Sequence, residues 1–185
     1  MYKGRLVRLR RLETDDVSAI LPHWNNYELR QYLPRPLPTG HDEMIEYIKS
    51  ANEAYSKRKA FTFGIETLDT KKLIGLVNLI NISWISSNAE LGLLAIFDPE
   101  HWGRGYGKDA MLVTLDLAFS TLGLNSVYLW VASFNSRAIA FYEKLGFKTQ
   151  GKLRELAYRD GQRYDVVTMD ILKSEFLEEH GVLPK

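Results

Sequence analysis

The sequence predicts a single mixed α/β domain over residues 1–185, with a central sheet flanked by helices. Between residues 90 and 145, strand-like and helix-like segments alternate, as they do when parallel strands are joined by helical crossovers. In the first half, short runs of alternating apolar and polar residues instead indicate antiparallel strands. No internal repeat or low-complexity tract interrupts the chain, and its 45% apolar content is sufficient for one substantial core.

The N-terminal third is predicted to contain one strand and two helices. Apolar residues alternate with arginines over residues 6–9, which indicates a strand with one face toward water. Thr14 begins a helix with apolar positions at 17, 20, 21 and 24, and Pro22 is expected to shorten or kink it. The proline-rich residues 34–38 indicate a loop. Thr39 and Asp42 then have capping-box spacing and begin an amphipathic helix that reaches Tyr55.

The rest of the chain alternates between strands and helices. A hairpin is predicted over residues 60–65 and 73–82, followed by a strand over 90–97. A helix around residues 110–118, a buried strand over 127–131 and a helix over 138–145 come next, and Gly146 suits the left-handed position that ends a helix. Residues 147–152 and 166–172 are predicted to be closing strands, with 175–179 a solvated helical tail.

Composition excludes several classes of function. Lys and Arg number 24 against 23 Asp and Glu, so there is no uniform positive field to hold a nucleic acid. The chain has no cysteine, and its four histidines do not have the spacing of a helical metal site, so we expect no metal. No apolar run is long enough for a membrane helix or a signal peptide, so we expect no membrane partner and a cytoplasmic protein.

Residues 98–108, between a predicted strand and a predicted helix, have the composition of a phosphate-binding loop. Gly103, Gly105 and Gly107 remove side chains where a backbone would approach a ligand, and glycine also tolerates left-handed torsions. Amides of this loop and of the helix's first turn would point outward, with the helix dipole adding positive potential. Arg104 and Lys108 supply positive charge for a phosphorylated ligand.

Spacing narrows the choice of phosphate ligand. A nucleotide-binding P-loop ending at Gly107 and Lys108 would need its first glycine at Trp102 and a hydroxyl at Asp109. A dinucleotide fingerprint that begins at Gly103 meets Lys108 where its third glycine belongs. A nucleotide-binding enzyme with an unusual loop therefore stays open only as a rival interpretation.

Two motifs resemble those of the GNAT acetyltransferases. Residues 102–107, Trp-Gly-Arg-Gly-Tyr-Gly, are similar to the family's pyrophosphate loop, Gln/Arg-x-x-Gly-x-Gly/Ala, except that Trp102 replaces the usual Gln or Arg. Residues 135–147 are similar to the family's Asn-x-x-Ala/Ser-x-x-x-Tyr-x-Lys-x-Gly-Phe. The Trp-Gly beginning of the loop is typical of the branch that acetylates ribosomal-protein N-termini. With weaker likeness elsewhere, the resemblance spans nearly the whole chain and implies a GNAT fold.

The resemblance implies acetyl-coenzyme A (acetyl-CoA) as cosubstrate and assigns residues to it. The backbone of the predicted strand end, at Ile96 and Phe97, is expected to pair with the pantetheine, and Asn135 to contact the cofactor near the second helix. The pyrophosphate is expected to bind the loop and the helix's first turn, at Gly103, Arg104, Gly105, Tyr106, Gly107 and Lys108.

The resemblance also implies direct transfer of the acetyl group to an amine. Tyr142 is expected to lie near the sulfur and protonate the departing thiolate, because collapse of the tetrahedral intermediate needs a proton donor or a charge-stabilising group there. Glu90 lies on the strand before the cofactor loop and is a candidate base that takes the amine proton directly or through a water.

The amine acceptor stays open. Overall similarity favours the branch that acetylates protein N-terminal amines, but relatives that acetylate polyamines, amino acids or other small molecules share the same outline. A polyamine would need an acidic pocket, to which Asp42, Glu43 and Glu46 could contribute. A noncatalytic acyl-CoA binding domain is a further alternative, and a homodimer is compatible with the resemblance.

Overall fold

The computed structural model describes residues 2–33 and 37–181, and its strands form a seven-stranded mixed sheet in the order β1-β2-β3-β4-β5-β7-β6. The chain divides into two compact units. The first contains the described residues up to Asn81 and Leu93–Thr114, and the second contains Ile82–Gly92 and the described residues from Leu115 onward. The mixed α/β fold class is confirmed, whereas the prediction of a single domain is not tested by this division and stays a prediction.

The first unit begins with the antiparallel strands that the alternating pattern predicted. Strand β1 (Val7–Arg10) pairs with β2 (Phe61–Thr67), and β2 pairs with β3 (Leu73–Ser83). Every residue of β2 is buried, so its strand character comes from β-branched and aromatic residues and not from a half-exposed alternation.

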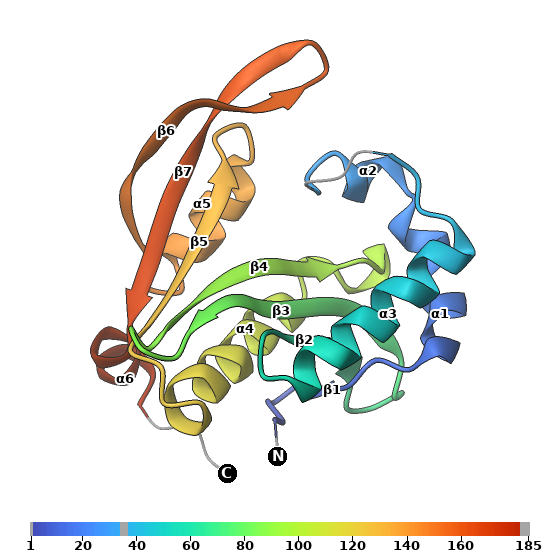
Figure 1. Ribbon diagram of the computed structural model, residues 1–185, viewed down its shortest axis with the longest axis horizontal. Helices are drawn as coiled ribbons and strands as arrows, with labels where there is room; N and C mark the ends of the chain where they lie inside the picture. The colour runs from blue at the N-terminus through green and yellow to red at the C-terminus, as the bar shows by residue number, and fades with distance from the viewer. Residues whose placement is uncertain (1, 34–36, 182–185) are drawn as a thin grey trace. The chain divides into compact units, whose positions relative to one another are not determined.

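Helices α1 (Val17–Trp24), α2 (Tyr27–Arg30) and α3 (His41–Ser56) belong to the same unit. A short 3₁₀ turn at Thr14–Asp16 precedes α1, and Pro22 lies within the last turn of α1, which is short and ends at Trp24. Figure 1 shows α3 running along the antiparallel strands, and its Met44 and Ile48 are fully buried in the core of this unit.

The start of α3 differs by one residue from the prediction. Gly40 precedes the first turn, and the Glu43 carboxylate accepts from its amide at 3.4 Å. Thr39 instead exchanges two backbone hydrogen bonds of 2.9 Å with the Asn25 side chain, which holds it outside the helix. The predicted loop over residues 34–38 lies partly outside the described residues.

The second unit is built on strands β5 (Ser126–Ala132), β6 (Lys148–Arg159) and β7 (Gln162–Leu172). Strand β4 (Asn88–Ile96) pairs with β5 in parallel within it, as the crossover pattern predicted. Strand β7 pairs antiparallel with both β5 and β6. Hairpin β6–β7 is longer than predicted (Figure 1), because most of β6 is exposed and therefore carries no apolar pattern.

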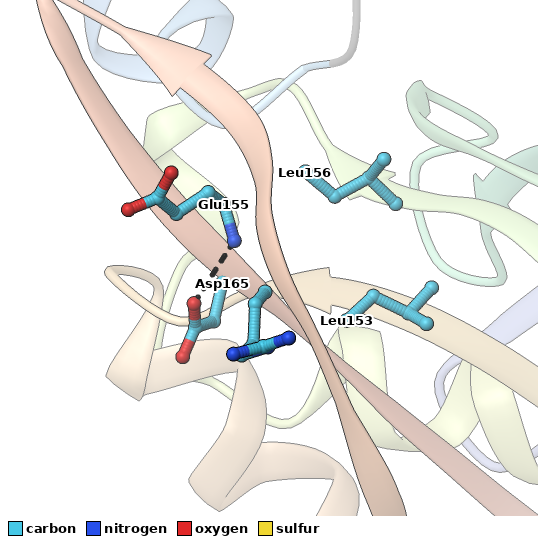
Figure 2. A pocket seen from close by; sticks show the side chains of 5 residues that line it. Leu153, Glu155, Leu156 and Asp165 are labelled. Atoms are coloured by element: carbon cyan, nitrogen blue, oxygen red, sulfur yellow. Dashed lines mark hydrogen bonds between the residues drawn. The ribbon is translucent and has the colours of Figure 1, made fainter.

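A bulge interrupts hairpin β6–β7. Its register shifts between Leu153 and Ala157, and Glu155 has a positive φ of 52° and donates its amide to the Asp165 carboxylate at 3.0 Å. Figure 2 shows Leu153 and Leu156 pointing to one side of the hairpin and Glu155 to the other. An open hollow at this bulge is lined by Leu153, Arg154, Glu155, Leu156 and Asp165.

Three helical segments complete the described chain. Helix α4 (Tyr106–Asp116) continues as one π-helical turn, Leu117–Thr121, and α5 (Ser136–Glu143) follows β5. The predicted solvated tail is wrong in one respect. Residues 173–180 form helix α6 (Lys173–His180), and its Phe176 is fully buried with its ring centroid 5.4 Å from that of Phe119. A lone aromatic among charged residues was too weak a pattern to predict this contact.

Candidate active site

The loop at residues 102–105, between a 3₁₀ turn (Pro99–His101) and helix α4, contains two glycines in left-handed conformations. Gly103 and Gly105 have φ values of 71° and 87°, and an added Cβ at Gly103 would meet nothing within 4 Å. The expected left-handed torsions are therefore confirmed at these two glycines. Gly107 differs, because it already lies in the first turn of α4.

The loop and the start of α4 also present the expected positive charge to solvent. Arg104 and Lys108 are exposed, and Tyr106 and Gly107 are partly buried. The Asp109 amide donates to the Gly105 carbonyl at 3.0 Å as α4 begins. The amides before it therefore lie at the open N-terminus of the helix, where an anion is favoured.

A buried carboxylate, that of Asp98, is bonded to several groups in the segment that precedes this loop. Asp98 is 1% exposed and has Lys72 Nζ 2.7 Å and His101 Nδ1 3.0 Å from its Oδ2, while its Oδ1 accepts from the Glu100 amide. Burial alone would raise the pKa of the Asp98 carboxyl, but Lys72, the Glu100 amide and His101 together hold it below its ordinary value. His101 in turn packs edge-on against Tyr106, the first residue of α4.

Trp102, the departure from the usual loop motif, is bonded to the end of strand β4. Its indole N–H donates to the Ile96 carbonyl at 2.6 Å. The Phe97 amide donates to the Ile74 carbonyl of β3 at 2.9 Å. The Phe97 N–H is therefore already used within the protein, whereas the Ile96 carbonyl, which has two lone pairs, can accept a second hydrogen bond.

In the second unit, the motif at residues 135–147 forms helix α5 and its two ends. The Asn135 side chain accepts from the Ala138 amide at 3.1 Å, so this residue is the N-cap of α5. At the other end, the Phe147 amide donates to the Tyr142 carbonyl at 3.1 Å, and Gly146 has a φ of 90°.

Tyr142 is partly buried and packs against two neighbouring rings. Its ring centroid lies 5.4 Å from that of Phe141 and 5.6 Å from that of Phe147. Burial raises the pKa of Tyr142 to about 12, so the phenol keeps its proton throughout the neutral range. The residue has the protonation state that a proton donor or hydrogen-bond donor needs.

Glu90 lies on strand β4 in the same unit, opposite Tyr128 of β5 in the parallel pairing. Burial, followed by the nearby Glu90 charge, raises the pKa of Tyr128. Tyr128 was not predicted as a site residue. Tyr128 lies next to Glu90 because of the strand register. The sequence alone does not specify this register for two parallel strands that are separated by a helix.

Each unit thus gathers a different part of the predicted site. Backbone groups of Ile96 and Phe97 and the loop at residues 103–108 belong to the first unit, whereas Glu90, Asn135 and Tyr142 belong to the second. Asp98, Lys72 and Asp109, which also contact the loop region, were not predicted, because their partners are distant in the sequence.

Two kinds of feature are not found in residues 2–33 and 37–181. No three acidic or histidine side chains gather in a way that could hold a metal ion. None of the helices there has the length and apolar character needed to cross a membrane.

Comparison with known proteins identifies the family. Residues 6–148 match the family model described as an acetyltransferase (GNAT) domain. The chain belongs to the GNAT acetyltransferase family. It is 36% identical to a spermidine N(1)-acetyltransferase of Vibrio cholerae over 170 residues. The alignment covers 91% of this chain and 94% of that relative. The spermidine N(1)-acetyltransferase of Escherichia coli K12 is 30% identical over 97% of this chain and 93% of its own length.

A solved structure is also similar to this chain. The crystal structure of spermidine N-acetyltransferase from Vibrio cholerae in complex with CoA and spermine has a TM-score of 0.81 and 35% sequence identity, covering 92% of this chain and 98% of that one. The predicted GNAT fold is therefore confirmed, and the protein is an N-acetyltransferase that uses acetyl-CoA. These relatives do not support the predicted ribosomal-protein branch, because both are spermidine acetyltransferases.

Proposed function

We propose that this enzyme transfers the acetyl group of acetyl-CoA to a polyamine of the spermidine class. One observation carries the proposal: two spermidine acetyltransferases are similar to the chain over more than nine-tenths of its length. The polyamine alternative drawn from the sequence is therefore favoured over transfer to a protein N-terminus.

Helix α3 offers the charge that such a substrate needs. A polyamine is a flexible chain with several positive charges, so accessible carboxylates favour its binding. Asp42, Glu43 and Glu46 are exposed in the first two turns of α3, whereas Met44 and Ile48 of the same helix are buried. Glu46 is also 2.7 Å from Lys49, so a polycation would compete with that lysine.

For the cofactor, we assign the pyrophosphate to the amides of Gly103 to Lys108, with Arg104 and Lys108 as its exposed cations. The two left-handed glycines and the open N-terminus of α4 support this assignment. The backbone near Ile96 and Phe97 and the side chain of Asn135 are assigned to the rest of the cofactor by their motifs alone.

For the reaction, we assign Glu90 as base and Tyr142 as the donor to sulfur. A neutral amine nitrogen forms a bond to the thioester carbon, and its proton passes to Glu90 directly or through a water. The carbon–sulfur bond then breaks, and the Tyr142 phenol donates to the departing thiolate. Burial keeps the Tyr142 phenol protonated throughout the neutral range, which is the state that this role requires.

An acceptor panel tests the proposed substrate. Purified enzyme with acetyl-CoA is offered spermidine, spermine, free amino acids and peptides with ribosomal-protein N-termini, and products are read by mass spectrometry with thiol release as the rate. We expect spermidine or spermine to have the highest kcat/KM. Peptide acetylation without polyamine acetylation would overturn the proposal and restore the N-terminal interpretation.

The acidic face of α3 is tested by charge removal. Asp42→Asn and Glu46→Gln should each raise the KM for spermidine by about two- to tenfold, the size expected for an exposed charge pair, and leave the KM for acetyl-CoA unchanged. Glu178→Gln on α6, which is also exposed, is the matched control and should change neither constant. An unchanged KM for spermidine in both α3 variants would remove this helix from the binding surface.

A further inference from the structure

The carboxylate of Asp109 forms an unusual set of long-range hydrogen bonds at the start of helix α4. Its Oδ1 accepts from the Arg5 amide at 3.0 Å, and its Oδ2 accepts from the Leu6 and Val7 amides at 2.7 and 2.9 Å. Three consecutive backbone N–H groups therefore converge on one side chain. Such a concave row of amides normally binds an anion.

The chain around these amides is folded back to form that concavity. The Gly4 amide donates to the Val7 carbonyl at 2.8 Å, and Lys3 pairs with Arg8 as an isolated antiparallel bridge. Gly4 permits this close approach, since an added Cβ would lie 2.3 Å from Asp109 Oδ2 and the carboxylate would have to shift. The turn at residues 4–7 and the Asp109 carboxylate thus fit each other with no room for a larger residue.

The same turn contacts the cofactor loop. A Cβ at Gly105 would lie 3.6 Å from Leu6 Cδ1, so the Leu6 side chain borders this glycine. The Asp109 amide also closes the first hydrogen bond of α4 onto the Gly105 carbonyl at 3.0 Å. Asp109 therefore bonds to the loop through its backbone and to the N-terminal turn through its side chain.

We propose that Asp109 is a positioning residue of the acetyl-CoA site, which fixes the N-terminal turn against Gly105 so that the pyrophosphate loop is ordered before the cofactor binds. The inference rests on the proposed assignment of the pyrophosphate to residues 103–108. Asp109 touches neither substrate nor cofactor in this account. Its negative charge, one residue beyond that loop, is directed to the three amides of the turn.

A positioning role and a simple electrostatic role predict opposite changes in CoA affinity for Asp109→Asn. Asp109→Asn removes a negative charge next to an anion site, so through charge alone it should tighten CoA binding. If Asp109 is a positioning residue, the substitution should weaken CoA binding. The side-chain NH₂ of the new asparagine would face at least one backbone N–H that the carboxylate accepts in the native protein. We expect the Kd for CoA to rise about tenfold, since hydrogen bonds to a charged acceptor are among the stronger ones in proteins.

Gly4→Ala tests the same contact without a change of charge. The added methyl group should displace the Asp109 carboxylate and raise the Kd for CoA in the same direction. In an Asp109→Ala background the clash disappears, so Gly4→Ala should then have no further effect. The matched controls are Asp116→Asn, at the far end of α4, and Gly40→Ala, where an added Cβ meets nothing within 4 Å.

The measurements are calorimetric Kd values for CoA and steady-state constants, at a temperature where circular dichroism shows each variant folded. We expect the KM for acetyl-CoA to rise with little change in kcat, which a merely structural role would not produce. The inference is overturned if folded Asp109→Asn binds CoA as tightly as the native enzyme or more tightly, while Gly105→Val loses affinity. If Gly105→Val also keeps its affinity, the loop assignment fails and the inference fails with it.

Discussion

The proposed cofactor loop at residues 102–108 and the motif at residues 135–147 are held in place in different ways. The loop region is bonded to residues far away in the sequence, through Asp98 to Lys72 and through Asp109 to the amides of residues 5–7. At the two ends of the α5 motif, hydrogen bonds instead join residues of the motif itself, Asn135 with Ala138 and Phe147 with Tyr142. A motif can therefore be local in sequence while its geometry depends on distant residues.

This difference predicts two kinds of mutational behaviour. A change confined to the Tyr142 hydroxyl should affect one function, because it leaves the backbone hydrogen bonds of the α5 motif in place. Changes around the loop should affect cofactor affinity even when the altered residue is far from the motif.

The largest expected effect is that of Tyr142→Phe. The substitution removes only a hydroxyl from a side chain packed between two rings, so folding and CoA affinity should be preserved. If the phenol donates to the leaving thiolate, kcat should fall by about 10²–10⁴ while the KM for acetyl-CoA changes little. A near-native kcat on a verified amine would return Tyr142 to a packing role.

Glu90→Gln should have the next largest effect, and its pH dependence identifies the role. Without a base, turnover near neutral pH should fall by about a hundredfold and recover partly at higher pH, where more of the amine is already deprotonated. A pH–rate profile that is scaled down equally at every pH would indicate that Glu90 positions the substrate or stabilises strand β4 instead.

Gly105→Val should weaken CoA binding by at least about tenfold, because it obstructs the backbone and strains a left-handed torsion. Gly123→Val is the matched control, since Gly123 has a φ of 71° with open space around it and no assigned ligand. Both variants should lose similar stability, and only Gly105→Val should lose affinity. Equal CoA affinities in the two variants would contradict the role of the loop.

The smallest expected effect on turnover is that of Asp98→Asn, which should act mainly on stability. Because the carboxylate is buried but its Lys72 partner is 48% exposed, we expect a loss of about 2 kcal/mol in the free energy of unfolding at neutral pH. Glu53→Gln, which breaks an exposed pair with Lys57, should leave the denaturation midpoint unchanged.

The effect of Asp98 should also depend on pH. Its pKa is lowered in the folded protein, so its contribution is present above the ordinary value of 3.8 and is lost as pH falls through the lowered value. The difference between native protein and Asp98→Asn in denaturant titrations should therefore shrink below about pH 4. A difference that is constant with pH would show that the ion pair is not its cause.

The same comparison explains what could be predicted from the sequence. The strands and helices with clear apolar periods, the left-handed Gly103 and Gly105, and the N-cap at Asn135 follow from local rules. The exposed β6 and the buried Phe176 do not follow, because their burial is decided by tertiary neighbours. Asp109 was recognised only as a residue that does not fit a P-loop, since the amides it binds are at the other end of the first unit's sequence.

The most direct test of this division of roles is the initial rate against acetyl-CoA concentration for Gly105→Val and Tyr142→Phe, with the amine that the acceptor panel selects. We predict that the Gly105→Val curve approaches the native rate at high acetyl-CoA, because the defect lies in binding. The Tyr142→Phe curve should stay low at every concentration. The opposite result, with rescue of Tyr142→Phe by cofactor and no rescue of Gly105→Val, would contradict the assignment of binding to the loop and of chemistry to helix α5.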